Sequence, residues 1–377
     1  MNRVFLLLCL ATAVWGQIRV GPYEVTLRLP PGGLTAQEEM QIEYRVVDAT
    51  RIDPVMGPAP VIRAQARSII DMPAMPGMAR ISETAHPEGV PGEYGVHPVF
   101  PHGGDYRLQL FITPPGAAEF PVVFPLQVGD PIPSRSRKPR PLPYFAEART
   151  QPRGVKAGEE TEIEIEVRSR ANNERVRQFD LQHERLMHLI LIRDDLNFFA
   201  HEHPAQDSSG AFRIRFTFPD AGDYVLFADA APKGAGGQVM PIRLRVSGKR
   251  PPRFRLQEVP LSAEARTPSL RIQFAATAFP TGKTLRLPAV LRLTADDTPV
   301  HDLEPYLGAL GHLILIHEDG QTYVHSHPDE LDPRAGQDGR MAFLARFPKP
   351  GRYRGWVQVQ RGGKVETGTI TIAAEAN

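Results

Sequence analysis

The chain has 377 residues, with 44 Lys and Arg against 43 Asp and Glu, and a formal net charge of +1. A balance this close to neutral favours neither nucleic acid nor an anionic membrane surface as a partner. The length exceeds that of one ordinary hydrophobic core and predicts two or three domains.

Residues 1–16 have the features of a secretory signal peptide. Arg3 precedes an apolar run over residues 4–14, and the small Gly16 closes the segment. The run is too short to span a membrane. Cys9 is the only cysteine of the chain, so the mature protein would have no disulfide and no thiolate ligand. We therefore expect a bacterial envelope protein, periplasmic or secreted, without a membrane span once the signal is removed.

The remaining sequence predicts an all-β fold. Apolar residues alternate with polar ones over segments such as 161–168 and 212–218, and no long stretch has helical periodicity. A strand, a Phe-Pro turn and Gly-x-Tyr recur over residues 92–106, 210–224 and 339–353. Short strands bounded by Gly and Pro are typical of β-sandwiches. The threefold repeat predicts three tandem immunoglobulin-like β-sandwich domains joined by Pro-rich linkers.

The domain boundaries follow from two basic, Pro-rich segments, which we interpret as solvated spacers. The predicted division is a signal peptide at 1–16, a first sandwich at 17–130, a linker at 131–143, a second sandwich at 144–248, a linker at 249–255 and a third sandwich at 256–377.

The first unit contains three methionines spaced three residues apart, Met72, Met75 and Met78, with prolines between them, and His86 follows. A polyproline II segment has three residues per turn and would place the thioethers on one edge. Thioethers select Cu(I), so these four residues are a candidate Cu(I) site. The alternative is that the methionines fill the core, a common use of Met.

The second and third units share a histidine pattern. A His-Leu-Ile-Leu-Ile run is followed, thirteen residues after its His, by His-x-His-Pro, over residues 188–204 and again over 312–328. Between the histidines the two copies share little, so the spacing itself is the repeated feature.

Each copy is predicted to be a β-hairpin. A turn at Asp319-Gly320 pairs His312 with His327 and places His325 on the same face. In the first copy, the pairing of Arg193 with Phe198 places His188 opposite His203, with His201 beside it. Two different turns thus predict the same cluster of three imidazoles.

Three converging neutral imidazoles suit copper or zinc and leave a coordination position open. The candidate metal ligands are His188, His201 and His203 in one unit and His312, His325 and His327 in the next. The alternative is that each histidine is a polar cap bonded to backbone. His183, His301 and His317 are candidates for supporting or surface positions only.

The first unit resembles the YtkA-like domains, which are exported immunoglobulin-like sandwiches, in Met72–Met78, Pro91–Tyr94 and Gly104–Tyr106. The second and third units resemble exported bacterial domains found in heavy-metal contexts, in 183–192 with 199–204 and in 302–312 with 324–328. The resemblance implies copper or heavy-metal handling without an established reaction.

Enzymatic patterns are incomplete. A cupin would need a Glu placed alike after each His-x-His and a later Gly/Pro/His motif, and a copper–zinc dismutase would need a disulfide. No Ser-His-Asp order or phosphate loop is present, so we do not expect an enzyme. The sequence predicts an exported protein that binds, buffers or transfers copper, with zinc as the alternative ion and another envelope protein as a candidate partner. The competing hypothesis is an envelope scaffold of tandem domains that binds no metal.

Overall fold

The computed structural model describes residues 13–30, 32–88, 90–129, 142–281, 284–329, 332 and 334–376. Over these residues the chain forms β-strands and two 3₁₀ turns, with no α-helix. The strands build three successive units of two sheets each, which confirms the predicted tandem sandwiches. Most of the predicted signal peptide, residues 1–12, and residues 130–141, which take in most of the first linker, lie outside the described residues.

Unit one contains two antiparallel-rich sheets, in the orders β1-β2-β4-β9-β8, with β5 beside β4, and β3-β11-β10-β6-β7. β1 starts inside the predicted signal peptide, and a register shift separates Val14 from Gly16. The strands are β1 (Ala13–Val20), β2 (Tyr23–Leu29), β3 (Leu34–Thr35), β4 (Ile42–Asp53), β5 (Gly57–Pro60), β6 (Gln65–Asp71), β7 (Ile81–Thr84), β8 (His86–Pro87), β9 (Glu93–Val96), β10 (Gly104–Thr113) and β11 (Phe120–Gly129).

Unit two packs the sheet β12-β13-β18-β17 against the sheet β14-β19-β15-β16, in which β20 also pairs with β19. The strands are β12 (Tyr144–Gln151), β13 (Glu160–Ser169), β14 (Phe179–Asp180), β15 (Met187–Arg193), β16 (Phe199–Glu202), β17 (Ala205–Gln206), β18 (Phe212–Thr217), β19 (Gly222–Pro232) and β20 (Gln238–Val246).

Unit three repeats this plan, with the sheets β21-β22-β24-β28 and β23-β30-β29-β26-β27 and with β25 beside β29. Its elements are η1 (Leu256–Glu258), β21 (Glu264–Arg266), β22 (Leu270–Phe274), β23 (Ala278–Pro280), β24 (Thr284–Leu293), β25 (Leu303–Glu304), β26 (His312–His317), β27 (Tyr323–Ser326), η2 (Gln337–Gly339), β28 (Arg340–Arg346), β29 (Gly351–Arg361) and β30 (Lys364–Glu375).

The Gly-x-Tyr repeat forms the same corner in every unit. The hydroxyls of Tyr106, Tyr224 and Tyr353 each donate to the backbone carbonyl four residues earlier, at 2.9, 2.8 and 2.8 Å. A tyrosine that bonds back over such a turn is a hallmark of immunoglobulin-like sandwiches. The repeat therefore fixes the crossing between the two sheets of each unit.

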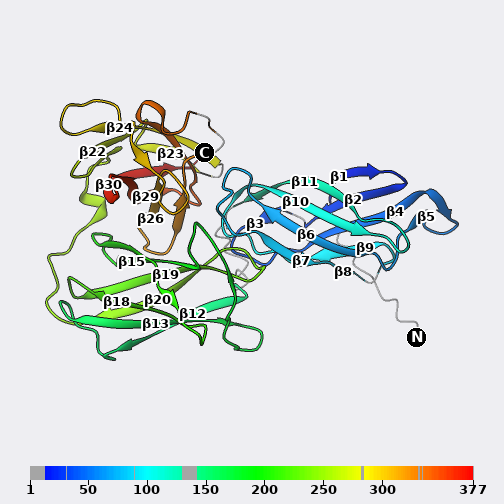
Figure 1. Cartoon of the computed structure of the whole chain (residues 1–377), viewed down its shortest axis with the longest axis horizontal. Coiled ribbons are helices and arrows are strands. Elements are labelled where there is room, and N and C mark those ends of the chain that lie inside the picture. The colour runs from blue at the N-terminus through cyan, green and yellow to red at the C-terminus, as the bar shows by residue number, and fades with distance from the viewer. Residues whose placement is uncertain are drawn as a thin grey trace, which may run out of the picture.

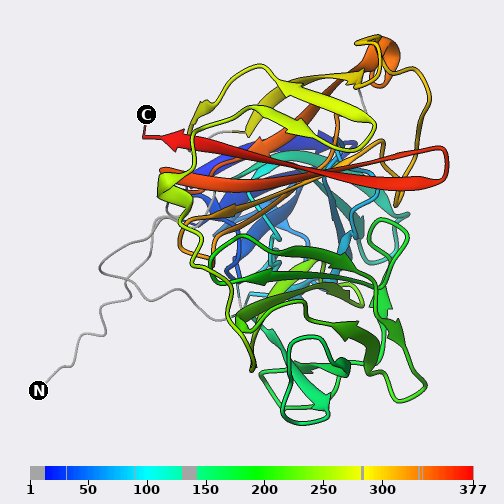
Figure 2. The ribbon, with the colours of Figure 1, turned by 90° about the vertical axis from the view of Figure 1, so that its left-hand side faces the viewer.

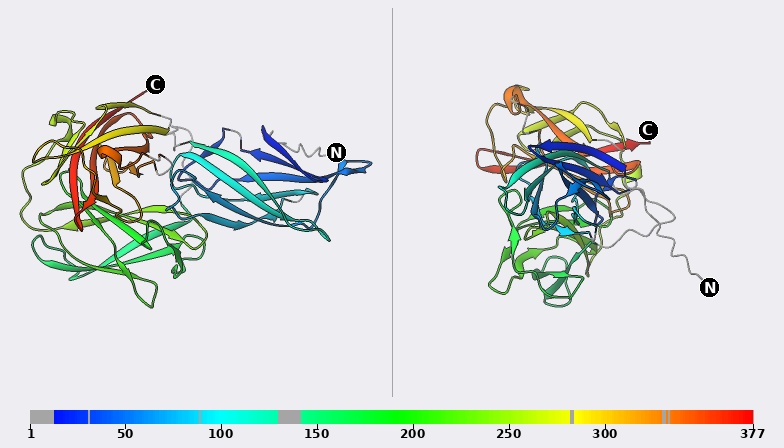
Figure 3. Two further views of the ribbon diagram at one scale, coloured as in Figure 1. Left: turned by 45° about the horizontal axis from the view of Figure 1, so that its top comes forward. Right: turned by 90° about the vertical axis from the view of Figure 1, so that its right-hand side faces the viewer.

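Units two and three lie face to face, and unit one extends away from one end of the pair (Figure 1). The views in Figures 2 and 3 agree on this arrangement. Beside the three unit cores, a fourth apolar cluster combines residues of units two and three, among them Ile190 and Ile192 on β15, Ile314 and Ile316 on β26, and Trp356 on β29. The sheets that carry the histidine hairpins are therefore the sheets that meet.

Candidate metal centre

The two histidine hairpins form in the predicted registers. Ile190 pairs with His201 between β15 and β16, and Ile314 pairs with His325 between β26 and β27. Residues two apart on a strand share a face, so each His-x-His segment turns both imidazoles to the side of the first histidine. The three histidines of each hairpin therefore cluster as predicted.

In unit two the three rings converge on one nitrogen. His188 Nδ1 lies 3.0 Å from His201 Nε2 and 3.2 Å from His203 Nε2. The other nitrogen of His188, Nε2, donates to the carbonyl of Gln182 at 2.9 Å. His188 is 1% exposed, so the point of convergence lies inside the protein.

Unit three repeats this arrangement. His312 Nδ1 lies 3.3 Å from His325 Nε2 and 2.9 Å from His327 Nε2, and His312 Nε2 donates to the carbonyl of Tyr306 at 2.8 Å. In each cluster one atom from each of the three imidazoles lies within 4.8 Å of the other two, a spacing that a single metal ion can bridge. We call these clusters the unit-two triad and the unit-three triad.

The two triads face each other across the interface between their units. The rings of His188 and His325 have centroids 6.0 Å apart, and those of His201 and His312 are 6.1 Å apart. Each triad is also held by the opposite unit. His201 Nδ1 donates to Gln358 Oε1 of unit three at 2.7 Å, and His325 Nδ1 lies 3.5 Å from Asp229 Oδ2 of unit two.

Equivalent residues make these cross-unit contacts. Asp229 is the ladder partner of His188, and Gln358 is the ladder partner of His312. The same exchange places Phe199 on Trp356, with ring centroids 4.8 Å apart, and Tyr323 on Phe227, at 5.2 Å. The interface is thus self-complementary, with the repeats of one chain related as two subunits of a symmetric dimer are.

Burial lowers the pKa of every imidazole in both triads. The pKa of His203 falls to about 2, because burial and then the neighbouring His201 and His188 disfavour the charged form. Burial also raises the pKa of Asp229. The neighbouring His188 and the hydrogen bond from Gln182 lower that pKa in part. The imidazoles are therefore neutral at pH 7, the form that binds metal.

A seventh histidine lies beside the triads. His183 is 5% exposed, and its ring centroid lies 3.9 Å from that of His327. Neither of its ring nitrogens has a hydrogen-bond partner among the described residues. Its backbone N–H donates to the carbonyl of Gly77 in unit one, and a Cβ at position 77 would lie 2.6 Å from His183 Nδ1. From the sequence spacing, His183 was predicted to lie only at a supporting or surface position. The structure buries it where all three units meet.

The methionine segment of unit one differs from the predicted polyproline II helix. Two turns, from Met75 N to Met72 O and from Met78 N to Met75 O, give it the three-residue repeat. Met72 and Met75 are buried in the core of unit one, as the packing alternative expected. Met78 lies with its Sδ 3.2 Å from Nε2 of His102, and His102 rather than His86 is its histidine neighbour.

His86 belongs to another group. Its ring stacks on His97, with centroids 4.8 Å apart, and its Nε2 lies 3.0 Å from Glu88. His86, Glu88 and His97 form a third group with metal-ligand spacing, but His86 is exposed. The structure therefore groups His86 with Glu88 and His97, and the predicted grouping of His86 with the methionines is wrong.

The other two accessory histidines have separate surroundings. His301 is exposed and lies 3.7 Å from Asp338. His317 points away from the unit-three triad, as its register predicts, and packs on Tyr353, with its Nδ1 accepting from the backbone N–H of Asp319.

A cavity of about 640 Å³ adjoins the triads. Its wall includes residues of all three units, among them Met78 and His102 of unit one, His183, His188 and Asp229 of unit two, and Tyr323, His325 and His327 of unit three.

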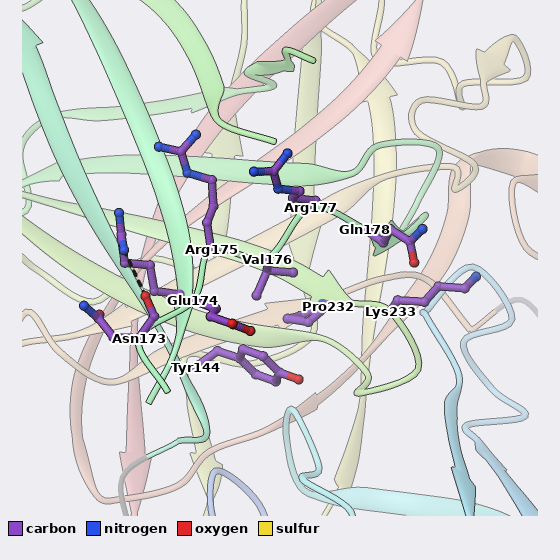
Figure 4. Close-up of a pocket in the computed structure, with 10 residues that line it drawn as sticks. Tyr144, Asn173, Glu174, Arg175, Val176, Arg177, Gln178, Pro232 and Lys233 are labelled. Carbon is purple, nitrogen blue, oxygen red and sulfur yellow. Dashed lines mark hydrogen bonds between the residues drawn. The ribbon is translucent and has the colours of Figure 1, made fainter. Parts of the chain in front are cut away.

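Another pocket, of about 750 Å³, is formed by unit two and is lined by Tyr144, Arg175, Arg177 and Lys233 (Figure 4). Arg175 is paired with Glu166, and Lys233 with Asp180, so two of its cations are already neutralised.

The histidine spacing alone does not reveal the residues that join units two and three. β15 and β26 are buried at every position, because Leu189 and Leu313 enter their own cores while Ile190 and Ile314 face the other unit. The signal was present in the unbroken apolar runs, since a strand with one wet face alternates and a strand buried on both faces does not.

A family model described as a domain of unknown function, DUF8832, matches residues 146–248 and 266–376, more than half of the chain. The chain belongs to this family. Each match contains one complete triad, so the family domain occurs twice and carries one triad in each copy. The resemblance of unit one to YtkA-like domains stays a prediction. No curated protein matches the chain.

Several solved structures are similar over most of the chain. The Escherichia coli adhesin FdeC is 13% identical, with 96% of this chain and 99% of that one covered and a TM-score of 0.21. Invasin, a bacterial integrin-binding protein, is 10% identical, with 94% and 60% covered and a TM-score of 0.20. A Bacteroides ovatus glucan-utilisation protein, SGBP-B, is 9% identical, with 91% and 65% covered and a TM-score of 0.20.

Among the described residues there is no helix long and apolar enough to cross a membrane.

Proposed function

We propose that this protein is an exported copper-binding protein in which the unit-two and unit-three triads each hold one copper ion. Export is inferred from the signal-like residues 1–16. The protein would bind, buffer or transfer copper in the bacterial envelope, and no catalytic step is assigned to it.

The observation that carries the proposal is the proton arrangement within the unit-two triad, whose geometry the unit-three triad repeats. The hydrogen bond from His188 Nε2 to the Gln182 carbonyl keeps the proton on Nε2, so Nδ1 of the neutral ring carries an unprotonated lone pair. The bond from His201 Nδ1 to Gln358 Oε1 likewise leaves Nε2 as a lone pair. These two lone pairs are 3.0 Å apart with no proton between them, and a cation at that point would stabilise both.

The purely structural alternative requires every buried imidazole to be satisfied by hydrogen bonds. His327 Nδ1 is buried without a partner, as are both nitrogens of His183. Each unsatisfied buried polar group costs about 1–3 kcal/mol. Hydrogen bonding within a scaffold therefore does not account for these buried imidazoles, although the metal position faces His327 Nε2 and not these nitrogens.

Three imidazoles suit zinc as well as copper, and the charge of the paired sites is what favours copper in its Cu(I) state. All three ligand atoms of each triad are neutral imidazole nitrogens, with no carboxylate among them. The facing rings have centroids 6.0–6.1 Å apart. Two ions separated by about 6 Å would repel by roughly 3 kcal/mol if monovalent and roughly 11 kcal/mol if divalent, at an effective dielectric constant of about 20. Buried neutral ligands would compensate the smaller repulsion more readily. Asp229 is the one carboxylate beside the triads, and it would offset part of the charge.

The methionine loop supports the same assignment. Met78 Sδ and His102 Nε2 lie 3.2 Å apart in the wall of the cavity that reaches the triads. A thioether beside an imidazole suits Cu(I). We propose that Cu(I) contacts this pair of side chains in unit one. Met72 and Met75 would contribute by holding the loop in the core.

Copper content of the full-length chain tests the proposal. Protein loaded with Cu(I) without oxygen, then desalted, is expected to retain two copper ions per chain, also in the presence of excess Zn²⁺. The variants His201→Ala/His203→Ala and His325→Ala/His327→Ala should each retain one, and His301→Ala, at an exposed site, should retain two. Retention of no copper, or equal retention in every variant, would favour the scaffold instead.

A further inference from the structure

We propose that the two triads are one binuclear centre, assembled only where units two and three dock, rather than two separate mononuclear sites. This inference rests on the proposed function, because it assumes that both triads hold copper. It adds that each copper site is completed by a residue of the other unit, and that the two ions are close enough for their unpaired electrons to interact in the Cu(II) state.

The first argument is distance. The facing rings of the two triads have centroids 6.0 and 6.1 Å apart, which is close to the 5.3 Å between His188 and His201 within one triad. The ring of His183 lies beside both clusters, with its centroid 6.1 Å from that of His188 and 5.9 Å from that of His312. The centre is therefore a single group of rings.

The second argument is the exchange of supporting contacts. Gln358 belongs to unit three but accepts the Nδ1 proton of His201 in unit two. That bond sets the tautomer that leaves Nε2 free for a metal. The amide is held in turn, since Gln358 Nε2 donates to Thr367 at 3.1 Å. Groups that orient a ligating histidine in this way typically change metal affinity by 10–100-fold when they are removed.

The third argument is that the interface is built to stay closed. The stacked pair of Phe199 and Trp356 joins the units, and so does the pair of Phe227 and Tyr323. Ile190, Ile192, Ile314 and Ile316 complete an apolar layer that is fully buried between the units. Beside this layer, His188, His312 and His327 are buried, and the other three triad histidines are half-buried.

The first experiment isolates the cross-unit contact in the full-length chain. A His325→Ala/His327→Ala background keeps only the unit-two triad. In that background Gln358→Leu, in unit three, is expected to weaken Cu(I) binding by the unit-two triad at least tenfold, measured by competition with a chromophoric Cu(I) chelator. Gln358→Glu keeps an acceptor and should restore the affinity.

Gln360→Leu is the matched control, because Gln360 lies on the same strand and bonds Glu304 within unit three. It should leave the affinity unchanged. Equal, measurable Cu(I) affinities with Gln358→Leu and Gln360→Leu would overturn the inference while copper binding itself stands.

The second experiment loads the wild-type chain with two equivalents of Cu(I), oxidises the bound copper to Cu(II) with ferricyanide, desalts the protein and records its electron paramagnetic resonance spectrum. A half-field transition, or a split or diminished main signal, is expected. The two triad-deletion variants, each with one Cu(II), should give ordinary isolated spectra. If the wild-type spectrum is simply the sum of these two, the ions are independent; copper binding would then stand while the binuclear centre would fall. If the wild type retains no copper at all, the proposed function itself fails.

Discussion

At the scale of single residues, the centre is defined by where each imidazole keeps its proton. Gln182 and Tyr306 hold the Nε2 protons of His188 and His312, so both first histidines present Nδ1 to the cluster. The His-x-His residues present Nε2 instead. Spacing in the sequence predicts that these side chains converge in two groups of three. It cannot predict the tautomers, because the carbonyls that set them belong to loops six residues upstream.

His183 gives a prediction at this scale. Its ring nitrogens are buried without partners, so replacement by Leu should raise the stability of the metal-free protein by about 1 kcal/mol. Denaturant unfolding of the full chain measures the change. His301→Leu, at an exposed site, should leave the stability within error. A clear loss of stability in His183→Leu would mean that its ring makes stabilising contacts that outweigh its unpaired nitrogens.

At the scale of elements, the strand registers were predictable and the covering of their outer faces was not. The pairing of Ile314 with His325 follows from one turn and one strand, both of which are local in sequence. The contact of Phe199 with Trp356 joins residues of different units, and nothing in the local pattern of either strand specifies it. The methionine segment is a case in which the local pattern was itself ambiguous. Its period of three fits a polyproline II helix and a pair of successive turns equally well, and burial of Met72 and Met75 selects the turns.

The stacked aromatic pair provides a test of this docking. Trp356 is the one tryptophan after the predicted signal peptide, so fluorescence reports on its surroundings alone in the mature chain. Phe199→Ala should shift its emission to longer wavelength and destabilise the protein by at least about 1 kcal/mol. Phe198→Ala removes a ring that packs on Phe216 and Tyr224 inside unit two, and the emission of the folded variant should not move. Unchanged emission in both variants would contradict the docked arrangement.

At the scale of the whole molecule, the buried histidines link stability to pH. Burial lowers their pKa values in the folded state, to about 2 for His183 and His203, while the unfolded chain keeps values near 6.5. Below that pH the unfolded state binds more protons, so stability is present above pH 6.5 and is lost as the pH falls from about 6.5 towards about 2. The raised pKa of Asp229 acts in the opposite sense, because protonation of its buried carboxyl favours the folded state.

The metal-free chain should therefore be destabilised by acid more steeply than a variant with fewer buried imidazoles. Each buried histidine adds at most about 1.4 kcal/mol per pH unit to the slope. The free energy of unfolding, measured between pH 8 and pH 5, should change little above pH 7 and fall below 6.5. His203→Asn should reduce the slope, and His301→Asn should not. A slope equal in all three proteins would show that the triads are protonated in the folded state.

The central claim is that six histidines of two repeated units hold two copper ions at one interface. Crystals of the copper-loaded full-length protein, measured on either side of the copper absorption edge, test it most directly. The account predicts two anomalous peaks between the hairpins, one roughly 2 Å from nitrogens of His188, His201 and His203 and the other equally near those of His312, His325 and His327. An anomalous map with no peak at either triad, or with copper only at the exposed group of His86, Glu88 and His97, would contradict it.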